Sequence, residues 1–259
     1  MNRRDFAAAA LAAPLLQLFA HSVHGQSKPN GRLKVGMFIY DDMIMLDLVG
    51  PLTVFNIMQA EVHLISRSTQ PVIPDVRIPI APTDTFETSP KVLDVLFVPG
   101  GLKGTLDAIK DDKTLDFVKE RGAAAGFVTS VCTGSLLLGA AGLLNGYQAT
   151  SHWYVRDLLA KMGATVRKDR VVVDRNRITG AGVTAGVDFG LTIAAKMAGE
   201  DAAKRIQLLI EYDPKPPFDA GSPEHAGPTL VDDVLARRKN LLDEAAVVVQ
   251  TTGERLNRG

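Results

Sequence analysis

The amino-acid sequence predicts an α/β protein whose sheet is doubly wound and mostly parallel. Two observations predict this class. Short apolar runs without helical periodicity alternate with amphipathic stretches, as buried parallel strands alternate with helices. The length of 259 residues is also ample for a sizeable core and suits one large α/β domain.

The strands are predicted from the apolar runs and from the residues that end them. The run 92–98, for example, ends in Pro99-Gly100-Gly101. Prolines within residues 72–80 confine that segment to an edge of the sheet or to an excursion from it. In chain order, the predicted strands cover residues 33–40, 62–65, 72–80, 92–98 and 127–131, followed by a hairpin of 171–174 with 177–179.

The helices are predicted from periodicity and from the residues that start or stop them. Pro51 suits the first turn of a helix that reaches about Gln59, because a proline needs no N–H there. Gly126 stops the next amphipathic helix. In chain order, the predicted helices cover residues 51–59, 115–125, 136–141, 185–198, 202–211 and 230–249, with a proline-rich loop before the last.

The N-terminal residues are predicted to be an export signal and not part of the fold. Arg3-Arg4 precedes an apolar stretch, and Val23-x-Gly25 offers small side chains to a signal peptidase. This order resembles a bacterial twin-arginine signal, which implies a periplasmic location. The alternative is an N-terminal helix or membrane anchor of a cytoplasmic protein. The predicted division is a signal over 1–25, a polar tether over 26–32 and one domain over 33–259.

Composition and charge exclude several classes of function. The 29 basic and 29 acidic residues balance, whereas a surface that binds nucleic acid needs an excess of lysine and arginine. The single cysteine, Cys132, excludes an intramolecular disulfide and any zinc or iron–sulfur site built on cysteines. His63, His152 and His225 lack the spacing of metal ligands. After the signal, no apolar run is long enough to span a membrane.

Cys132 lies where a reactive residue of an open α/β sheet is expected. The strand 127–131 leads into it, a helix follows from Ser135, and active sites of such sheets lie beyond the carboxyl ends of the strands. Gly134 is expected to permit a sharp turn, as in a nucleophile elbow. The start of the helix is expected to lower the pKa of the thiol. The alternative is a buried and inert cysteine.

The segment TSVCTGSLLLGAAGLLNGYQATSHW and the upstream VPGG resemble the ThiJ/PfpI superfamily. Within it, MLDLVGPLTVF, the VCTGS turn and LLIEYDPKPPFDAGSP resemble the isocyanide hydratases, and the likeness covers nearly all of the chain after residue 33. The resemblance implies a flavodoxin-like fold and a homodimeric enzyme without a cofactor. It also implies hydration of a small isocyanide, R–N≡C, to an N-substituted formamide.

The resemblance carries roles to three side chains. Cys132 matches the nucleophile, Asp47 matches the acid beside that thiol, and Thr133 matches a contact of the site in the hydratases. The peptidase-like branch has a histidine at the position of Thr133, so this threonine argues against a peptidase. The alternatives are a helix N-cap before Pro51 for Asp47 and ordinary turn chemistry for Thr133.

These groups suit the chemistry of hydration. A thiolate is a strong nucleophile, and attack by Cys132 on the isocyanide carbon gives a thioimidate. Asp47 is expected to deliver the proton and then to help activate the water that releases the formamide. The backbone N–H groups of Gly100, Gly101 and Thr133 are expected to face developing charge. For Gly100-Gly101 the alternative is a plain turn after a strand.

Other functions stay open on the sequence. The same thiol could serve a glyoxalase-like or deglycase-like enzyme on this fold. A non-enzymatic alternative is a ligand- or redox-sensing domain related to the front half of AraC-type regulators, acting through oxidation of Cys132. Too few residues follow the AGSP loop for the helix-turn-helix module of those regulators. His152 could pair with the thiol but is expected to pack beside Trp153, and Gly180-Ala181-Gly182 is expected to permit close backbone packing.

Overall fold

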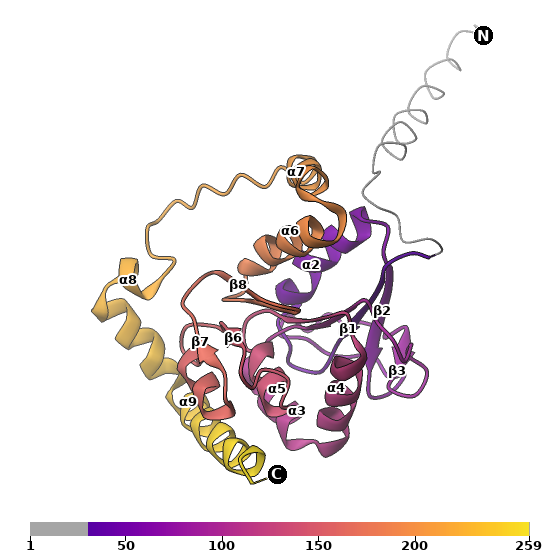
Figure 1. The fold of residues 1–259 in the computed structure, drawn as a ribbon. Helices are drawn as coiled ribbons and strands as arrows, with labels where there is room; N and C mark the ends of the chain where they lie inside the picture. Colours follow the sequence, from indigo (N-terminus) through magenta and orange to yellow (C-terminus); the bar gives the residue numbers. More distant parts are fainter. Residues whose placement is uncertain (1–30, 259) are drawn as a thin grey trace, which may run out of the picture.

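The apolar runs form a seven-stranded sheet in the computed structural model, which describes residues 31–258 (Figure 1). The strand order is β3-β2-β1-β4-β5-β9-β8, and every neighbouring pair is parallel except the predicted hairpin of β8 and β9. The strands are β1 (Lys34–Phe38), β2 (Glu61–Ser66), β3 (Asp84–Thr85), β4 (Val95–Val98), β5 (Phe127–Ser130), β8 (Val171–Asp174) and β9 (Arg177–Gly180), with β6 (Gln148–Ala149) and β7 (Thr165–Val166) paired separately.

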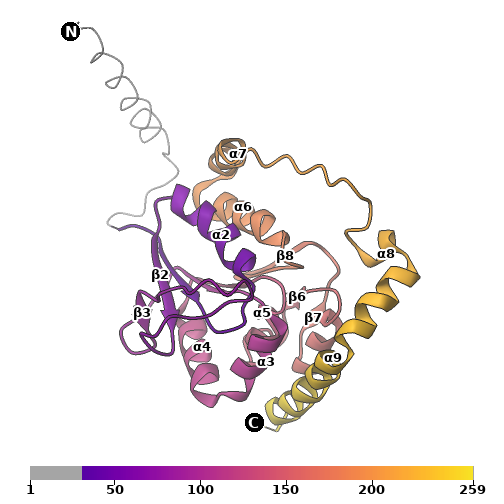
Figure 2. The same cartoon turned by 180° about the vertical axis from the view of Figure 1, so that it is seen from behind.

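Helices cover both faces of the sheet, which confirms the doubly wound architecture (Figures 1 and 2). One face carries α2 (Met45–Ile57) and α6 (Ala185–Ala198), with α7 (Glu200–Leu209) packed on α6. The other face carries α3 (Leu102–Lys110), α4 (Asp112–Ala124) and α5 (Gly134–Ala140), and η1 (Arg156–Met162) and α9 (Pro228–Leu256) pack beyond them, with the short α8 (Pro223–Ala226) before α9.

The central strands are buried on both faces, which is why their sequences are apolar runs and not alternating patterns. All four residues of β4 are fully buried. On one face Phe97 packs against Phe189 of α6, with ring centroids 5.4 Å apart. Elsewhere in the core Phe38 of β1 packs against Phe117 of α4, with centroids 6.1 Å apart. Each such side chain stabilises the fold by about 1.5–3 kcal/mol, so the strand ends that carry the site are firmly held.

Two expectations about individual elements are wrong, and one helix was not anticipated. Residues 72–80 form no strand but only one antiparallel bridge, between Val72 and Ile80, because prolines remove N–H donors from this segment. Pro51 lies in the middle of α2 and not in its first turn, so the carbonyl of Asp47 lacks its usual helical partner. The helix α3 was not anticipated, since Gly104 lowers its intrinsic propensity.

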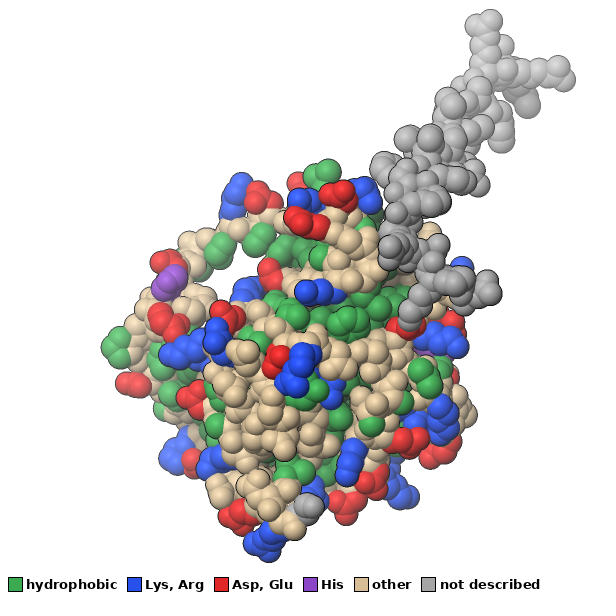
Figure 3. All heavy atoms as spheres, in the orientation of Figure 1, with side chains coloured by type: hydrophobic (Ala, Val, Ile, Leu, Met, Phe, Trp, Pro, Cys, Tyr) green, Lys and Arg blue, Asp and Glu red, His purple; other side chains and the backbone are tan. Residues whose placement is uncertain are grey.

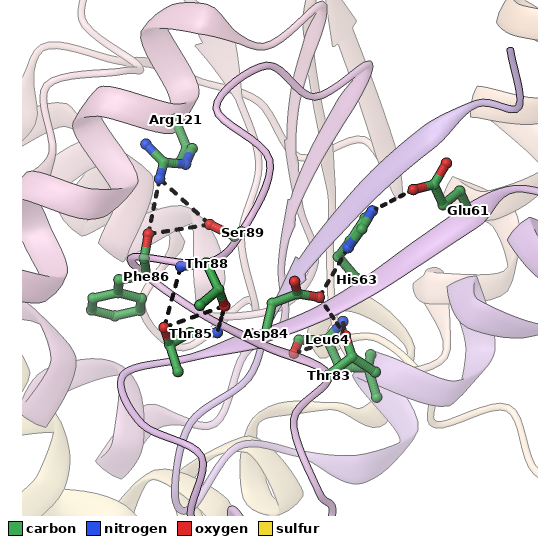
Figure 4. Close-up of polar contacts among 10 residues, drawn as sticks. All are labelled: Glu61, His63, Leu64, Thr83, Asp84, Thr85, Phe86, Thr88, Ser89 and Arg121. Atoms are coloured by element: carbon green, nitrogen blue, oxygen red, sulfur yellow. Dashed lines mark hydrogen bonds and ion pairs between the residues drawn. The ribbon is translucent and has the colours of Figure 1, made fainter.

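Polar contacts fix the edge of the sheet at β2 and β3 (Figure 4). The Nδ1 of His63 and the hydroxyl of Thr83 lie 2.9 and 2.8 Å from Oδ2 of Asp84. The loop after β3 is held by Arg121 of α4, whose buried guanidinium donates to the carbonyl of Phe86 at 2.9 Å. These contacts are structural, and within residues 31–258 no group of three His, Cys, Asp or Glu side chains is placed to hold a metal ion.

The proline-rich segment between α7 and α8 crosses open space (Figures 1 and 3). Nearly all side chains of residues 211–222 are exposed, and Phe218 is 79% exposed. Figure 3 shows an opening between this segment and the body of the molecule. The segment carries the chain from the α6 face of the sheet to α8 and α9.

The predicted signal, residues 1–25, and most of the predicted tether lie outside the described residues. Within the described part, no helix combines the length and the apolar character that crossing a bilayer requires. The described chain starts at Gly31 and enters β1 at Lys34.

Candidate active site

The ends of three strands meet at one edge of the sheet, and the candidate site lies there. The chain proceeds outward from β1 to β3 on one side and from β4 to β9 on the other, so the strand order reverses between β1 and β4. Ligands of open α/β sheets bind at such a point. Asp47 follows β1, Gly100 follows β4 and Cys132 follows β5. The fold therefore brings the predicted site residues together.

Cys132 forms a sharp turn between β5 and α5. Its φ of 54° lies in the left-handed region, which a residue with a Cβ adopts only when its surroundings hold it there. Its N–H donates to the carbonyls of Gly180 and Ala181, with distances of 3.1 and 2.7 Å. Its carbonyl accepts hydrogen bonds from the hydroxyls of Ser135 and Ser151, at 3.2 and 2.9 Å. These bonds hold the strained residue, and Gly180-Ala181 packs closely as predicted.

Gly134 is needed in this turn, although not for the predicted reason. Among the described residues, the positive φ of the turn belongs to Cys132 and not to Gly134. A Cβ on Gly134 would lie 2.4 Å from the carbonyl oxygen of Val98 and 2.5 Å from that of Pro99. The glycine therefore allows the turn to approach the end of β4. An elbow is present, with the strain at the cysteine and the close approach at the glycine.

The carboxyl group of Asp47 is completely buried beside Cys132. Its Oδ2 accepts the N–H of Gly100 at 2.8 Å, whereas its Oδ1 has no nitrogen or oxygen partner. A Cβ on Gly100 would lie 2.8 Å from Oδ2 of Asp47 and 2.6 Å from the Cβ of Cys132, so only a glycine fits between them. The helix α2 has no side-chain N-cap bond, and the alternative of a capping role for Asp47 is therefore wrong.

Burial has the largest effect on the pKa values of both Asp47 and Cys132. Burial raises the pKa of Asp47 to about 7, opposed by the Gly100 N–H and the Cys132 thiol and assisted by the charge of Asp75. Burial also raises the pKa of Cys132, as does the charge of Asp47, although the Thr133 N–H lowers it. The predicted net lowering of the thiol pKa at the start of α5 is therefore wrong. Above pH 7 the two groups together hold one proton and one negative charge.

Thr133 and the two glycines after β4 support one another. The N–H of Gly101 donates to the hydroxyl of Thr133 at 2.9 Å, and this hydroxyl lies 2.9 Å from that of Thr105. Since Gly100 is bound to Asp47, both glycine N–H groups are already engaged. They position Asp47 and Thr133, contrary to the expectation that they face developing charge. The Thr133 N–H is directed at the thiol and helps to lower its pKa.

Cys132 lines an open cleft of about 520 Å³, a size that suits a small-molecule substrate. The segment 152–154 forms an aromatic wall of this cleft. Another wall is apolar and comes from α8 and α9, through Ala226, Leu230, Val231, Val234 and Leu241. The charged side chains of the cleft include Asp42, which is paired with Lys103 at 2.7 Å and with Arg77 at 3.2 Å.

The aromatic wall contains two residues that were considered from the sequence, His152 and Trp153, and one that was not, Tyr154. The ring of His152 lies 5.9 Å from that of Trp153 and 3.7 Å from that of Tyr154, so its predicted packing role is present. Burial lowers the pKa of His152 to about 4, with Arg238 and Arg156 adding to the effect, so its ring is neutral near pH 7. Tyr154 directly follows Trp153 in the sequence and was missed as a site residue. Arg238 was interpreted as part of a solvated helix face, because only the fold brings α9 to this wall.

Comparison with known proteins identifies the family to which the chain belongs. Residues 33–196, more than half of its length, match the model of the DJ-1/PfpI family. The chain belongs to the DJ-1/PfpI family. The predicted resemblance to the ThiJ/PfpI superfamily is thereby confirmed, together with the flavodoxin-like fold.

Two relatives are 45% identical to this DJ-1/PfpI protein over the aligned residues. The isonitrile hydratase of Pseudomonas putida is 45% identical over 226 residues, which are 87% of this chain and 98% of the relative. The crystal structure of a ThiJ/PfpI family protein from Pseudomonas syringae is also 45% identical and superposes with a TM-score of 0.82, covering 88% and 99% of the two chains. The transcriptional regulator GbdR of Pseudomonas aeruginosa is 25% identical over 69% of this chain and 50% of the regulator.

Proposed function

We propose that this protein is an enzyme that hydrates isocyanides to N-substituted formamides. The observation that carries the proposal is the pairing of Cys132, held in a strained turn at a cleft, with the completely buried carboxyl of Asp47. Its 45% identity to an isonitrile hydratase over nearly the whole of that enzyme supports the same reaction. Net addition of water needs no external oxidant or reductant, so the reaction requires no redox cofactor.

In the first step, the sulfur of Cys132 bonds to the terminal carbon of R–N≡C. The carbon takes up the one proton that the thiol and Asp47 share, and the product is the thioimidate R–N=CH–S–Cys132. A carboxyl group whose pKa is about 7 suits this transfer, since the ideal pKa of a catalytic acid lies near the working pH. The N–H of Thr133 stabilises the thiolate before attack.

In the second step, a water molecule adds to the thioimidate carbon. Asp47 is now a carboxylate and can accept a proton from that water. The nitrogen gains a proton as the C=N double bond is lost, giving R–NH–CH(OH)–S–Cys132. Cleavage of the C–S bond then releases R–NH–CHO and restores the thiol. The Gly100 N–H keeps Asp47 beside the sulfur throughout, at 2.8 Å from Oδ2.

Formamide production from a simple aryl or alkyl isocyanide tests this proposal. We expect turnover in the ordinary range of enzymes, about 1–10³ s⁻¹, and far slower conversion of methylglyoxal. Turnover of methylglyoxal without turnover of any isocyanide would favour the glyoxalase-like alternative. A thiol that is oxidised by mild peroxide in a protein that converts neither compound would favour the sensing domain.

We propose that the working form is a homodimer, and the open segment before α8 supports this. Phe218 on that segment is 79% exposed, and Leu208 and Leu209 at the end of α7 are 81% and 69% exposed. Large apolar side chains that are this exposed suit an interface between subunits. Light scattering of the full-length protein, measured as it elutes from a size-exclusion column, is expected to give twice the chain mass of 27.8 kDa. The Phe218→Asp variant is expected to shift toward the monomer, and a monomeric wild-type protein would refute the proposal.

We also propose export to the periplasm through the twin-arginine signal. The support is the order of Arg3-Arg4, the apolar stretch and the small residues at Val23 and Gly25. Replacing both arginines by lysine is expected to move the protein from the periplasmic to the cytoplasmic fraction, with the larger precursor mass. Equal distribution of variant and wild type between the fractions would count against export by this route.

A further inference from the structure

The hydroxyl of Tyr154 is a polar group of the cleft that the two steps above do not use. Tyr154 lines the same cleft as Cys132. Its ring is held by neighbours: the His152 ring centroid lies 3.7 Å away, that of Trp153 lies 5.7 Å away, and Arg238 Cζ lies 5.6 Å from the centroid. The hydroxyl makes no hydrogen bond to any residue in the described range 31–258. The Tyr154 ring is therefore held in place, while its hydroxyl is free to donate a hydrogen bond to a ligand.

The Tyr154 hydroxyl is also close enough to Cys132 and Asp47 for their charges to shift its pKa. Burial raises the pKa of Tyr154, and the charges of Cys132 and Asp47 raise it further. The hydroxyl therefore keeps its proton throughout the working range of pH and can act only as a neutral donor or acceptor. By contrast, the charged groups that shift the pKa of His152 are Arg238 and Arg156, and not the thiol.

The second step of the reaction needs such a donor. When water adds to R–N=CH–S–Cys132, the electron pair of the C=N bond moves to nitrogen, which must be stabilised until it gains its proton. Asp47 is occupied with the water at that moment, and the N–H groups of Gly100 and Gly101 are bound to Asp47 and Thr133. We infer that the Tyr154 hydroxyl donates a hydrogen bond to the thioimidate nitrogen and so promotes hydrolysis of the covalent intermediate.

In this step the atoms balance without a further reactant. The water supplies the hydroxyl group that bonds to carbon, and its other hydrogen reaches the nitrogen through Asp47 and the Tyr154 hydroxyl. Tyr154 ends with the proton count with which it began. The C–S bond then breaks, and the sulfur recovers its proton. This role rests on the proposed isocyanide chemistry, of which it concerns the second half.

The Tyr154→Phe variant tests the inference because it removes only the hydroxyl and keeps the ring among its neighbours. We expect kcat for an isocyanide to fall 10- to 100-fold. KM is expected to fall in parallel, so that kcat/KM, which reports adduct formation, stays within twofold of wild type. During turnover, intact-protein mass spectrometry is expected to find most of the variant carrying the added mass of one isocyanide, and little of the wild type.

The matched control is Tyr147→Phe, since Tyr147 stacks on Arg175 and does not line the cleft. We expect its kinetics to equal those of wild type. Melting curves of both variants verify that the fold is retained. An unchanged kcat in Tyr154→Phe, or a loss of kcat/KM without accumulation of the adduct, overturns the inference. A wild-type protein that yields neither formamide nor adduct overturns the proposed function itself, which distinguishes the two failures.

Discussion

Replacing Cys132 by alanine is expected to reduce formamide production from an isocyanide by about 10³-fold or more. The variant lacks the only thiol of the chain, while the buried Asp47 and the cleft are retained. Steady-state turnover measures the loss, and intact-protein mass spectrometry is expected to find no covalent adduct. Cys132→Ser is expected to be equally inactive, because a hydroxyl group is far less ionised than a thiol near neutral pH.

Formamide production by Cys132→Ala at a rate near that of wild type would refute the covalent mechanism. Loss of the fold is the other explanation for inactivity, and it is tested separately. Alanine keeps the Cβ and the backbone bonds of Cys132 to Gly180, Ala181, Ser135 and Ser151. The melting temperature of the variant is therefore expected to lie within a few degrees of wild type.

Replacing Asp47 by asparagine is expected to reduce kcat/KM at pH 7.5 by about 10²-fold or more, the usual contribution of a general acid or base. Asparagine fills the same space and can still accept the Gly100 N–H, so the arrangement around the thiol is kept. It can neither give nor take a proton. The rate of isocyanide hydration measures the effect, and Asp233→Asn on the exposed side of α9 is the control.

The pH dependence of this variant distinguishes proton transfer from a purely structural role. In wild type, the pair loses its first proton near pH 7, where the pKa of Asp47 lies, and attack by sulfur needs that loss. Activity is therefore expected to rise with pH through about 7 and then to stay level. In Asp47→Asn only the thiol can ionise, and burial raises its pKa, so the rise moves to alkaline pH. An unchanged rise near pH 7 would contradict the assignment.

The positions of Cys132 and Asp47 could be predicted because each has a local signature. A buried strand that leads into Cys-x-Gly and a helix places the thiol at the end of the sheet. A second apolar run followed by LDLVGP places Asp47 at the end of another strand. Parallel strands bring their carboxyl ends to one edge, so the two side chains had to lie near each other.

Other parts of the site depend on the folded structure and leave no local signature. The sequence Cys-Thr-Gly fits a turn with positive φ at the glycine as well as one with positive φ at the cysteine. The structure has the second, because Gly134 must approach Val98 at the end of another strand. The sign of the thiol pKa shift depends on burial, which exceeds the local effect of the α5 start. Tyr154 and Arg238 meet only because α9 returns to the sheet after the proline-rich segment.

Cys132 is only 1% exposed as a residue, although it lines the cleft. We expect this near-complete covering to restrict which electrophiles can reach the sulfur. An isocyanide carries its reactive carbon bare at the tip of a linear C≡N unit, so that the atom can reach the sulfur while its bulky substituent stays outside. The reacting atom of a disulfide or of a branched carbonyl compound is instead flanked by substituents on two sides. Modification of Cys132 by such compounds is therefore expected to be slower than its reaction with an isocyanide.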